Sequence, residues 1–377
     1  MSSTNVTPRK GKEPAEKAER LHVSIHGRPV GTLTLTSGRL CAFQYDSAWL
    51  QDGYSISPFE LPLKAGVMIA RSSPFEGGFG VFDDSLPDGW GMLILDRFLR
   101  KKGIDPNSLS ILARLAIVGK SGRGALEFYP EAEVVNTNLG FVDFEALAAE
   151  AKRILQSDSY SGKGIEEFQL RGGSPGGARP KIFTVYDSRE WLVKFPARQD
   201  PVDIGKIEYR FSCLARECGV EMPETRLFED KFFATERFDR SDGRKLHVVS
   251  MAGLLNADYR VPSIDYNHIF QVARVLTMST DELWKVFRLM VINFLIGNKD
   301  DHAKNFAFLN REGKWHLAPG FDLLPSDGMN GFHTTSFNDK ISPEPSDLVD
   351  IAVKAGLDRL EADKVLQEMS ATVRRHS

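Results

Sequence analysis

The segment GNKDDHAKNFAFL, residues 297–309, contains the side chains whose types and spacing best fit a reaction centre. Asp300 and Asn305 have the Asp-x4-Asn spacing by which protein kinases place one carboxylate at the attacking hydroxyl and one amide oxygen on magnesium. The metal needs a second carboxylate, and Asp322 follows Asn305 by 17 residues in APGFDLLPSD, which we expect to form an apolar strand. The pattern predicts magnesium-dependent phosphoryl transfer.

A phosphoryl-transfer centre also needs a glycine loop over the phosphates, a lysine on the following hairpin and a glutamate that holds this lysine. These features occur upstream in that order, as the loop Gly172–Gly177, Lys194 in WLVKFP and Glu208 in the helical stretch IEYRFSCLARECG. A lysine between Val193 and Phe195 would lie in apolar surroundings and would need a charged partner if buried. The main chain of FATERFDR, residues 233–240, would then hydrogen-bond adenine.

Each of these features has a simpler explanation when taken alone. Glycine clusters usually form turns, a strand lysine is usually solvated, and Asp322 could cap a turn. GNKDDHAKN could be a helix end followed by exposed charges. The loop lacks the GK[ST] ending, which argues against a P-loop nucleotidase. The shared order of all the features favours a kinase.

Composition limits the classes of function. Of the 377 residues, 42% are apolar and 26% charged, which is typical of a soluble globular protein. The formal net charge of −3 offers no overall positive field for direct nucleic-acid binding. The three cysteines lack CxxC or Cys/His spacing, which argues against a disulfide scaffold or a zinc site. Because no apolar run reaches about 18 residues and the start does not resemble a signal peptide, we expect a cytoplasmic protein without membrane contact.

Hydrophobic periodicity divides the chain into four parts and predicts an α+β fold. Residues 1–19 hold almost no large apolar side chains and should be a disordered tail. Alternation around HGRP, then a turn at PDG and a helix to Gly103, predicts a β-rich domain over 20–135. Residues 136–255 should contain an amphipathic helix, a glycine-rich loop over 161–179, the hairpin of KIFTVY and WLVKFPA, and a mixed sheet that includes FFATERFD and LHVVS. Residues 256–377 should be mainly helical, with the apolar run LWKVFRLMVINFLIG as a central helix that ends at Gly297.

Four groups of motifs resemble the HipA family of bacterial type II toxin serine/threonine kinases. They are FDDSLPDGWGMLILDRFL, SPGGARPK, TERFDR, and GNKDDHAKNFAF with LAPGFDLLPSD. The resemblance runs from about residue 21 to the C-terminus. It implies a compact β-rich N-terminal domain, then a protein-kinase-like (PI3/4-kinase-like) domain of two lobes. The first lobe would hold the glycine loop, and the second would be mainly helical with the catalytic and metal-binding motifs.

Matched motif by motif, the resemblance implies a role for each site residue, with ATP and Mg²⁺ as cofactors. At the position of Arg179 the best-known members have a glutamine, and there this sequence departs from the family pattern. Glu208 is a candidate partner of Lys194 because kinases in general hold this lysine with a helix glutamate, and the family motifs do not imply it. The implied roles are these: catalytic base, Asp300; magnesium ligands, Asn305 and Asp322; phosphate lysine, Lys194; groups near the phosphates, Lys181 and His302; main-chain adenine contacts, Glu236 and Phe238; autophosphorylated and self-inactivating serine, Ser174.

The resemblance also implies partners. These are a small helix-turn-helix antitoxin of HipB type, through which DNA would be contacted only indirectly, and a protein substrate that is often an aminoacyl-tRNA synthetase. Two other hypotheses stay open from the sequence. One is a kinase of a small metabolite or lipid head group that uses the same centre. The other is a catalytically silent corepressor that acts with the DNA-binding partner.

Overall fold

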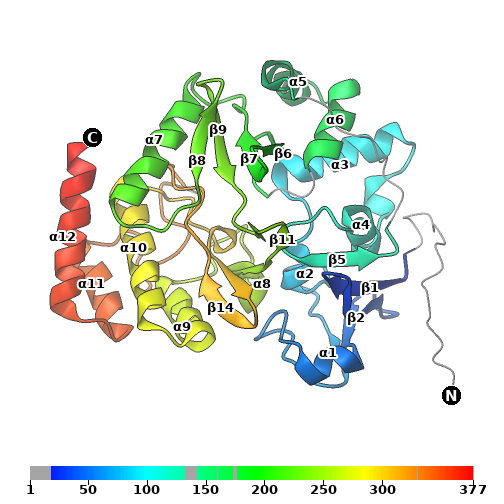
Figure 1. Ribbon diagram of the computed structural model, residues 1–377, viewed down its shortest axis with the longest axis horizontal. Coiled ribbons are helices and arrows are strands. Elements are labelled where there is room, and N and C mark those ends of the chain that lie inside the picture. The colour runs from blue at the N-terminus through cyan, green and yellow to red at the C-terminus, as the bar shows by residue number, and fades with distance from the viewer. Residues whose placement is uncertain (1–17, 132–141, 159, 173–175, 329, 377) are drawn as a thin grey trace.

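The computed structural model of the protein describes residues 18–131, 142–158, 160–172, 176–328 and 330–376. The chain forms a β-rich N-terminal part, a middle part built on a four-stranded sheet, and a helical C-terminal part. In Figure 1 the N-terminal sheet lies on the right, the C-terminal end of the chain lies at the far left, and the middle part extends across the top. The arrangement confirms the predicted α+β class, with strands first and helices last. The exact domain boundaries stay predictions.

The N-terminal part is an antiparallel sheet in the order β4-β3-β2-β1-β5, with four helices and a 3-10 turn around it. Leu21, Val23 and Ile25 of β1 face the core, as the alternation predicts. His26 and Gly27 both have positive φ and close the tight turn to β2. The elements are β1 (Arg20–Ile25), β2 (Arg28–Leu35), β3 (Cys41–Tyr45), α1 (Ser47–Asp52), β4 (Val67–Ile69), α2 (Gly80–Asp83), α3 (Gly89–Lys101), η2 (Pro106–Ser108), α4 (Ile111–Val118) and β5 (Leu126–Tyr129).

The middle part is a four-stranded antiparallel sheet in the order β6-β7-β9-β8. The predicted hairpin is present as β6 and β7, and α7 packs against β8 and β9. The elements are α5 (Phe144–Gln156), α6 (Lys163–Gly172), β6 (Lys181–Tyr186), β7 (Arg189–Lys194), α7 (Ile204–Glu217), β8 (Thr225–Phe228), β9 (Phe232–Glu236), β10 (Arg240–Ser241) and β11 (Arg244–Lys245).

Two sequence predictions for this region are wrong. The sheet is not mixed, because all its pairs are antiparallel and LHVVS joins a different sheet as β12 (His247–Ser250). The segment 161–179 is not a loop throughout, because residues 163–172 form α6. The apolar residues Ile165 and Phe168 are buried on one face of that helix, and this burial outweighs the helix-breaking effect of the glycines.

The C-terminal part combines five helices with a three-stranded sheet in the order β12-β13-β14. The longest apolar run forms α10, which ends at Gly297 in the left-handed conformation, as the sequence predicts. The remaining elements are α8 (Met251–Leu255), α9 (Tyr266–Thr277), α10 (Thr280–Ile296), η3 (Ala303–Asn305), β13 (Ala307–Arg311), β14 (Lys314–Leu317), α11 (Pro345–Lys354) and α12 (Arg359–Arg375).

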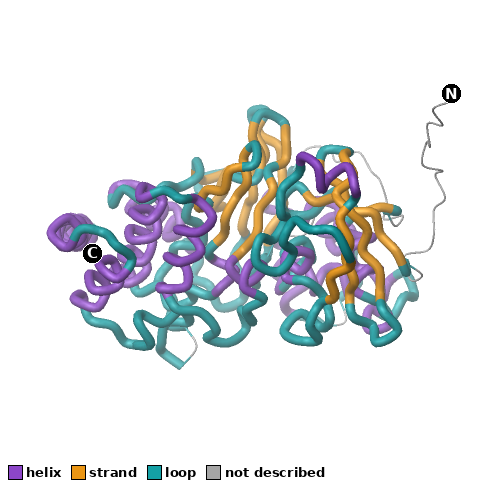
Figure 2. The backbone as a smooth tube through the Cα atoms, turned by 90° about the horizontal axis from the view of Figure 1, so that it is seen from below, coloured by secondary structure: helices purple, strands orange, loops and turns teal. Residues whose placement is uncertain are grey.

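One hydrophobic core runs through both the N-terminal and the C-terminal parts. Helices α2 and α8 meet in it so closely that a Cβ on Gly80 would lie 2.7 Å from the Cα of Gly253. Of the predicted tail, the structure describes only Ala18 and Glu19, and Ala18 is buried in this core. In Figure 2 the helices of the C-terminal part gather at one end and the strands occupy the centre and the other end. Within the described ranges, no helix is both long and apolar enough to cross a membrane.

Candidate active site

Lys194 lies at the centre of a buried charge cluster. It ends β7, an inner strand of the middle sheet, and its side chain is 7% exposed. Its Nζ forms ion pairs with Glu208 of α7 and with Asp322 of the C-terminal part. Burial lowers the pKa of Lys194, but the two carboxylates outweigh burial and the net shift is upward. The lysine is therefore charged at neutral pH, and it joins three elements at one point.

Asp322 does not lie in a strand, contrary to the sequence prediction. Its φ of 54° lies in the left-handed region, which Asp tolerates better than most residues, and residues 318–325 form no strand. Its carbonyl accepts a hydrogen bond from Asn298 Nδ2 at 3.3 Å. Burial raises the pKa of Asp322, but Lys194 and then Lys181 reverse this and hold the pKa well below its usual range. Backbone strain of this kind is common at functional sites.

Asp300 and Asn305 are joined within one short loop. Asn305 Nδ2 donates to the Asp300 carbonyl at 2.7 Å, which leaves the amide oxygen of Asn305 to face another group. The Asp300 side chain is exposed. Desolvation raises its pKa, His302 opposes the shift, and the nearby Asp322 adds to it. His302 is the N-cap residue of η3, and its Nδ1 accepts a hydrogen bond from the N–H of Lys304 at 3.2 Å.

Sequence reasoning missed Asp301, which is fully buried beside Asp300. Its carboxylate accepts hydrogen bonds from the backbone N–H groups of Thr334 at 2.9 Å and Thr335 at 3.1 Å, and it lies 3.0 Å from His333 Nδ1. Two adjacent aspartates look alike in a sequence. Only the segment 333–335, distant along the chain, distinguishes the buried one, which fixes the loop, from the exposed one.

A chain of buried hydrogen bonds links the Asp300–Asn305 loop with Asp322. Tyr266 donates to Asp301 at 3.0 Å, Asn293 donates to Tyr266 at 3.0 Å, and Asn298 donates to Asn293 at 2.9 Å. Asn298 also bonds the carbonyl of Asp322, as described above. Buried polar networks with all their members paired are rigid. This network therefore holds the Asp300–Asn305 loop and Asp322 at a constant separation.

Lys181 and Arg179 place further positive charge beside Lys194. Lys181 lies opposite Lys194 in the register of the β6–β7 hairpin, and its Nζ donates a hydrogen bond to the carbonyl of Gly176. Burial lowers the pKa of Lys181 to about 8. Arg179 makes a two-pronged ion pair with Asp200, at 2.9 and 3.0 Å. The predicted phosphorylation site, Ser174, lies outside the described residues.

The predicted adenine contacts lie at the junction between the middle and C-terminal parts. The N–H of Glu236, at the end of β9, already donates to the Glu224 carbonyl at 2.8 Å. The Phe238 ring stacks on Phe321, with ring centroids 5.4 Å apart, and so adjoins Asp322. Phe238 thus lies beside the site, while the side chain of Glu236 pairs with Arg189 at 3.2 Å.

The donor atoms fit a magnesium ion. Mg²⁺ prefers hard oxygen ligands, and in nucleotide sites it uses one or two carboxylates together with phosphate and water. Asp322 offers an ionised carboxylate and Asn305 an amide oxygen. Among the described residues, no group of three or more His, Cys, Asp or Glu side chains could hold a metal without such outside ligands.

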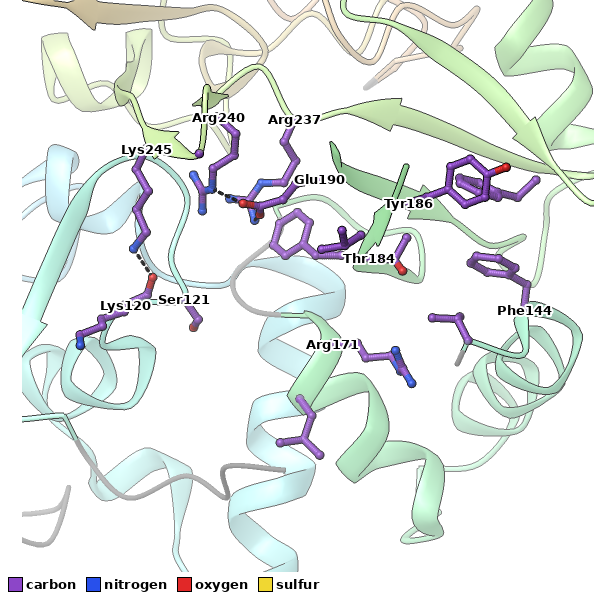
Figure 3. Close-up of a pocket in the computed structure, with 16 residues that line it drawn as sticks. Lys120, Ser121, Phe144, Arg171, Thr184, Tyr186, Glu190, Arg237, Arg240 and Lys245 are labelled. Carbon is purple, nitrogen blue, oxygen red and sulfur yellow. Dashed lines mark hydrogen bonds and ion pairs between the residues drawn. The ribbon is translucent and has the colours of Figure 1, made fainter. Parts of the chain in front are cut away.

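A separate pocket of about 640 Å³ lies between β6, the start of α5, the end of α6 and the β10–β11 hairpin (Figure 3). None of the predicted site residues lines it. Two of its arginines, Arg237 and Arg240, share the carboxylates of Asp239 and Glu190, and a third, Arg171, pairs with Glu167. The charge of these arginines is therefore neutralised within the protein. We therefore place the candidate active site at Lys194 and not in this pocket.

Comparison with family models identifies the family. The HipA N-terminal domain model matches residues 21–129, and the HipA-like C-terminal domain model matches residues 173–377. The chain belongs to the HipA family.

Similar proteins and structures agree with this assignment. A protein of Sinorhizobium fredii named "Putative kinase Y4dM" is 25% identical over 330 residues, which are 82% of this chain and 77% of the relative. A Haemophilus influenzae protein with the generic name "Putative kinase" is 22% identical over 187 residues, 42% of this chain and 54% of that relative. A solved structure of the Shewanella oneidensis MR-1 toxin–antitoxin system HipA, HipB and its operator DNA has the same fold. Its TM-score is 0.69 at 19% identity, and the match covers 94% of this chain and 89% of that one.

Proposed function

We propose that the protein is a HipA-type toxin kinase that transfers the γ-phosphate of ATP to a serine or threonine hydroxyl of a protein. The observation that supports this best is the ion-pair cluster of Lys194 with Glu208 and Asp322 beside Asp300. Protein kinases use a strand lysine held by a helix glutamate, together with a metal-binding aspartate. The kinase names of two relatives support the same class of reaction.

In the proposed reaction each residue has a role that follows from its surroundings. Asp300, exposed and with a raised pKa, would accept the hydrogen bond of the substrate hydroxyl and orient it. Lys194, held by Glu208, would present its charge to the phosphates. Mg²⁺, held by Asn305 and Asp322, would neutralise phosphate charge. Positioning and charge stabilisation provide most of the catalysis in reactions of this class.

Further contacts complete the proposed nucleotide site. Lys181 and His302 would lie near the phosphates, and the main chain at Glu236 and Phe238 would bind adenine. Because the N–H of Glu236 is already bonded, its carbonyl and the Phe238 main chain are the groups left for this role.

Autophosphorylation at Ser174 is part of the proposal. A phosphoserine carries a charge of about −1.5 to −2. It would stand two residues before Gly176, whose carbonyl accepts from Lys181. The new charge would compete with ATP for Lys181, and the modified protein would be inactive.

The proposed partners follow from the family. The similar Shewanella structure contains HipA, HipB and operator DNA, and we propose a HipB-type antitoxin for this protein, with DNA contacted through it. The net charge of −3 agrees with this indirect contact. We propose a cytoplasmic protein substrate, with aminoacyl-tRNA synthetases as the first class to test.

Intact-mass spectrometry after incubation with ATP and Mg²⁺ tests the proposal. Wild type should gain one phosphate, mapped by fragmentation to Ser174, and D300N should gain none while keeping its circular-dichroism spectrum. Transfer in D300N would contradict the role of Asp300. Rapid ATP use with one metabolite and an unmodified chain would indicate a metabolite kinase. No ATP binding by calorimetry would indicate a silent corepressor.

A further inference from the structure

Asp88 occupies the N-cap position of α3 but does not cap its own helix. Its carboxylate accepts a hydrogen bond from the N–H of Gly177 in the glycine loop. In return, the N–H of Trp90, in the first turn of α3, donates to the Gly177 carbonyl at 3.0 Å. An N-cap aspartate normally bonds N–H groups of its own first turn. Here the glycine loop of another part of the chain replaces those local bonds.

The contact requires two glycines because the backbones approach so closely. A Cβ on Gly89 would lie 2.5 Å from the Gly177 carbonyl oxygen, and Gly89 has a φ of 45°. Gly177 has a φ of 92°, which other residues rarely adopt. A Cβ on Gly176 would lie only 3.2 Å from the Asp88 carboxylate. The loop and the start of α3 are therefore built to fit each other.

The same carboxylate also binds the Asp300–Asn305 loop. Lys304 Nζ lies 3.1 Å from Asp88 and 3.0 Å from Asp83, and over the Tyr259 ring at 4.1 Å. The Lys304 side chain is 10% exposed. Lys304 is therefore largely enclosed by the two carboxylates and the Tyr259 ring. One oxygen of the Asp88 carboxylate thus accepts from the N–H of Gly177, and the other pairs with Lys304 of the Asp300–Asn305 loop.

We propose that Asp88 is a positioning residue by which the N-terminal part holds Gly176 and Gly177, the described end of the glycine loop, against the Asp300–Asn305 loop in the position that binds nucleotide. The inference rests on the proposed kinase function and deepens it. If the bond between Asp88 and Gly177 is lost, the loop occupies its binding-competent position for a smaller fraction of the time. Apparent nucleotide affinity falls by that same fraction, while the chemical step in the occupied site is little changed.

Asp83 provides a matched control, since among the described residues it pairs with Lys304 and, unlike Asp88, does not bond Gly177. D83N and D88N each remove one of the two carboxylate charges around Lys304. D88N keeps a neutral acceptor for the Gly177 N–H, which forms a weaker bond than a carboxylate does. D88A removes the contact of residue 88 with Gly177 and its contact with Lys304. The series therefore separates the effect of the Lys304 charge from the effect on the loop.

Two measurements on the full-length variants test the proposal. Hydrogen–deuterium exchange of peptides covering Gly176–Lys181, without nucleotide, should accelerate in D88A, less in D88N, and not in D83N. The KM for ATP should rise about tenfold in D88A, the scale of one lost hydrogen bond to a charged group, with kcat changed less than about threefold. If D88A does not fold, faster exchange in D88N than in D83N supports the proposal.

Equal exchange in D88N and D83N, or in D88A and D83N, would overturn it. A fall in kcat at unchanged KM would also contradict a positioning role for the loop. The exchange measurement needs no nucleotide and no activity. If wild type binds no ATP, the proposed function fails, but the bond between Asp88 and the loop is still tested.

Discussion

At the scale of single residues, the site is defined by how its charges are paired. The ammonium group of Lys194, on β7, pairs with Glu208 of α7 and with Asp322 of a loop in the C-terminal part. Removing one partner of a buried pair leaves the other charge without compensation, and this costs more than the pair contributes to stability. Substitutions that remove charge but keep shape are therefore the most informative here.

The first residue-scale prediction concerns Glu208. E208Q should lower the free energy of unfolding by about 2 kcal/mol, the scale of one hydrogen bond to a charged group, and should raise the KM for ATP. Urea denaturation and steady-state kinetics measure the two effects. E217Q is the control on the same helix, because Glu217 pairs with Arg375 in solvent, where an ion pair contributes at most about 1 kcal/mol. Equal effects of the two substitutions would contradict the role of Glu208.

The second residue-scale prediction concerns pH. Burial lowers the pKa of Lys181 to about 8 in the folded protein, below its ordinary value of 10.5. The free enzyme should lose this positive charge above pH 8, so kcat/KM for ATP should fall with an apparent pKa of about 8. K181R keeps the charge and should remove this decline. A decline near pH 8 that persists in K181R would assign it to another group.

The sign for stability is opposite to the sign for activity. Because the folded state binds fewer protons than the unfolded state between about pH 8 and 10.5, this lysine adds stability as pH rises through that window. Loss of activity above pH 8 should therefore occur without unfolding, which circular dichroism at each pH can check.

At the scale of elements, the position of α7 decides whether Glu208 reaches Lys194. Helix α7 packs on the β8–β9 hairpin, and a Cβ on Gly205 would lie 2.0 Å from the Lys231 carbonyl oxygen. Backbone on both sides of this contact leaves no flexible side chain to move aside. The glycine is needed for the close approach of the helix to the sheet.

G205A should therefore move α7 away from the sheet. We expect a loss of about 1–3 kcal/mol of stability, as for overpacked cores, together with a raised KM for ATP. G313A is the control, since Gly313 has a φ of 84° with no atom near its Cβ position, and should cost about 1–2 kcal/mol from backbone strain alone. Denaturation and kinetics on both variants test this. An unchanged KM in G205A would show that α7 tolerates the shift.

At the scale of the whole molecule, the N-terminal part is packed against the rest of the protein and is not an independent domain on a linker. It shares one hydrophobic core with the C-terminal part. Its Asp84 accepts hydrogen bonds from the backbone N–H and the hydroxyl of Ser250, both at 2.7 Å. Trp90, Ile94 and Phe98 of α3 also belong to the core beneath the middle sheet.

A fragment of residues 142–377 should therefore be insoluble or unfolded when expressed alone. It would expose the apolar surfaces of α8 and α6 that α2 and α3 cover in the full chain. Co-expression with residues 18–131 is the control and should restore soluble material. A soluble, cooperatively unfolding fragment would contradict the shared core.

The sequence by itself determined many of the elements and the order of the site residues along the chain. Local patterns are sufficient for the β1–β2 hairpin around HGRP, the β6–β7 hairpin and α10 with its end at Gly297, because periodicity and turn residues act within a few positions. The same holds for the Asp-x4-Asn spacing of Asp300 and Asn305, which one short loop contains.

Only the tertiary structure decided which distant residues meet. Strand β12 joined β13 and not the middle sheet, and Asp301 became a buried acceptor while Asp300 stayed exposed. Asp88 reached Lys304 across 216 residues. These outcomes depend on contacts between segments far apart in the chain, and their free energy comes from burial and pairing in the assembled fold. No local pattern of residues encodes them.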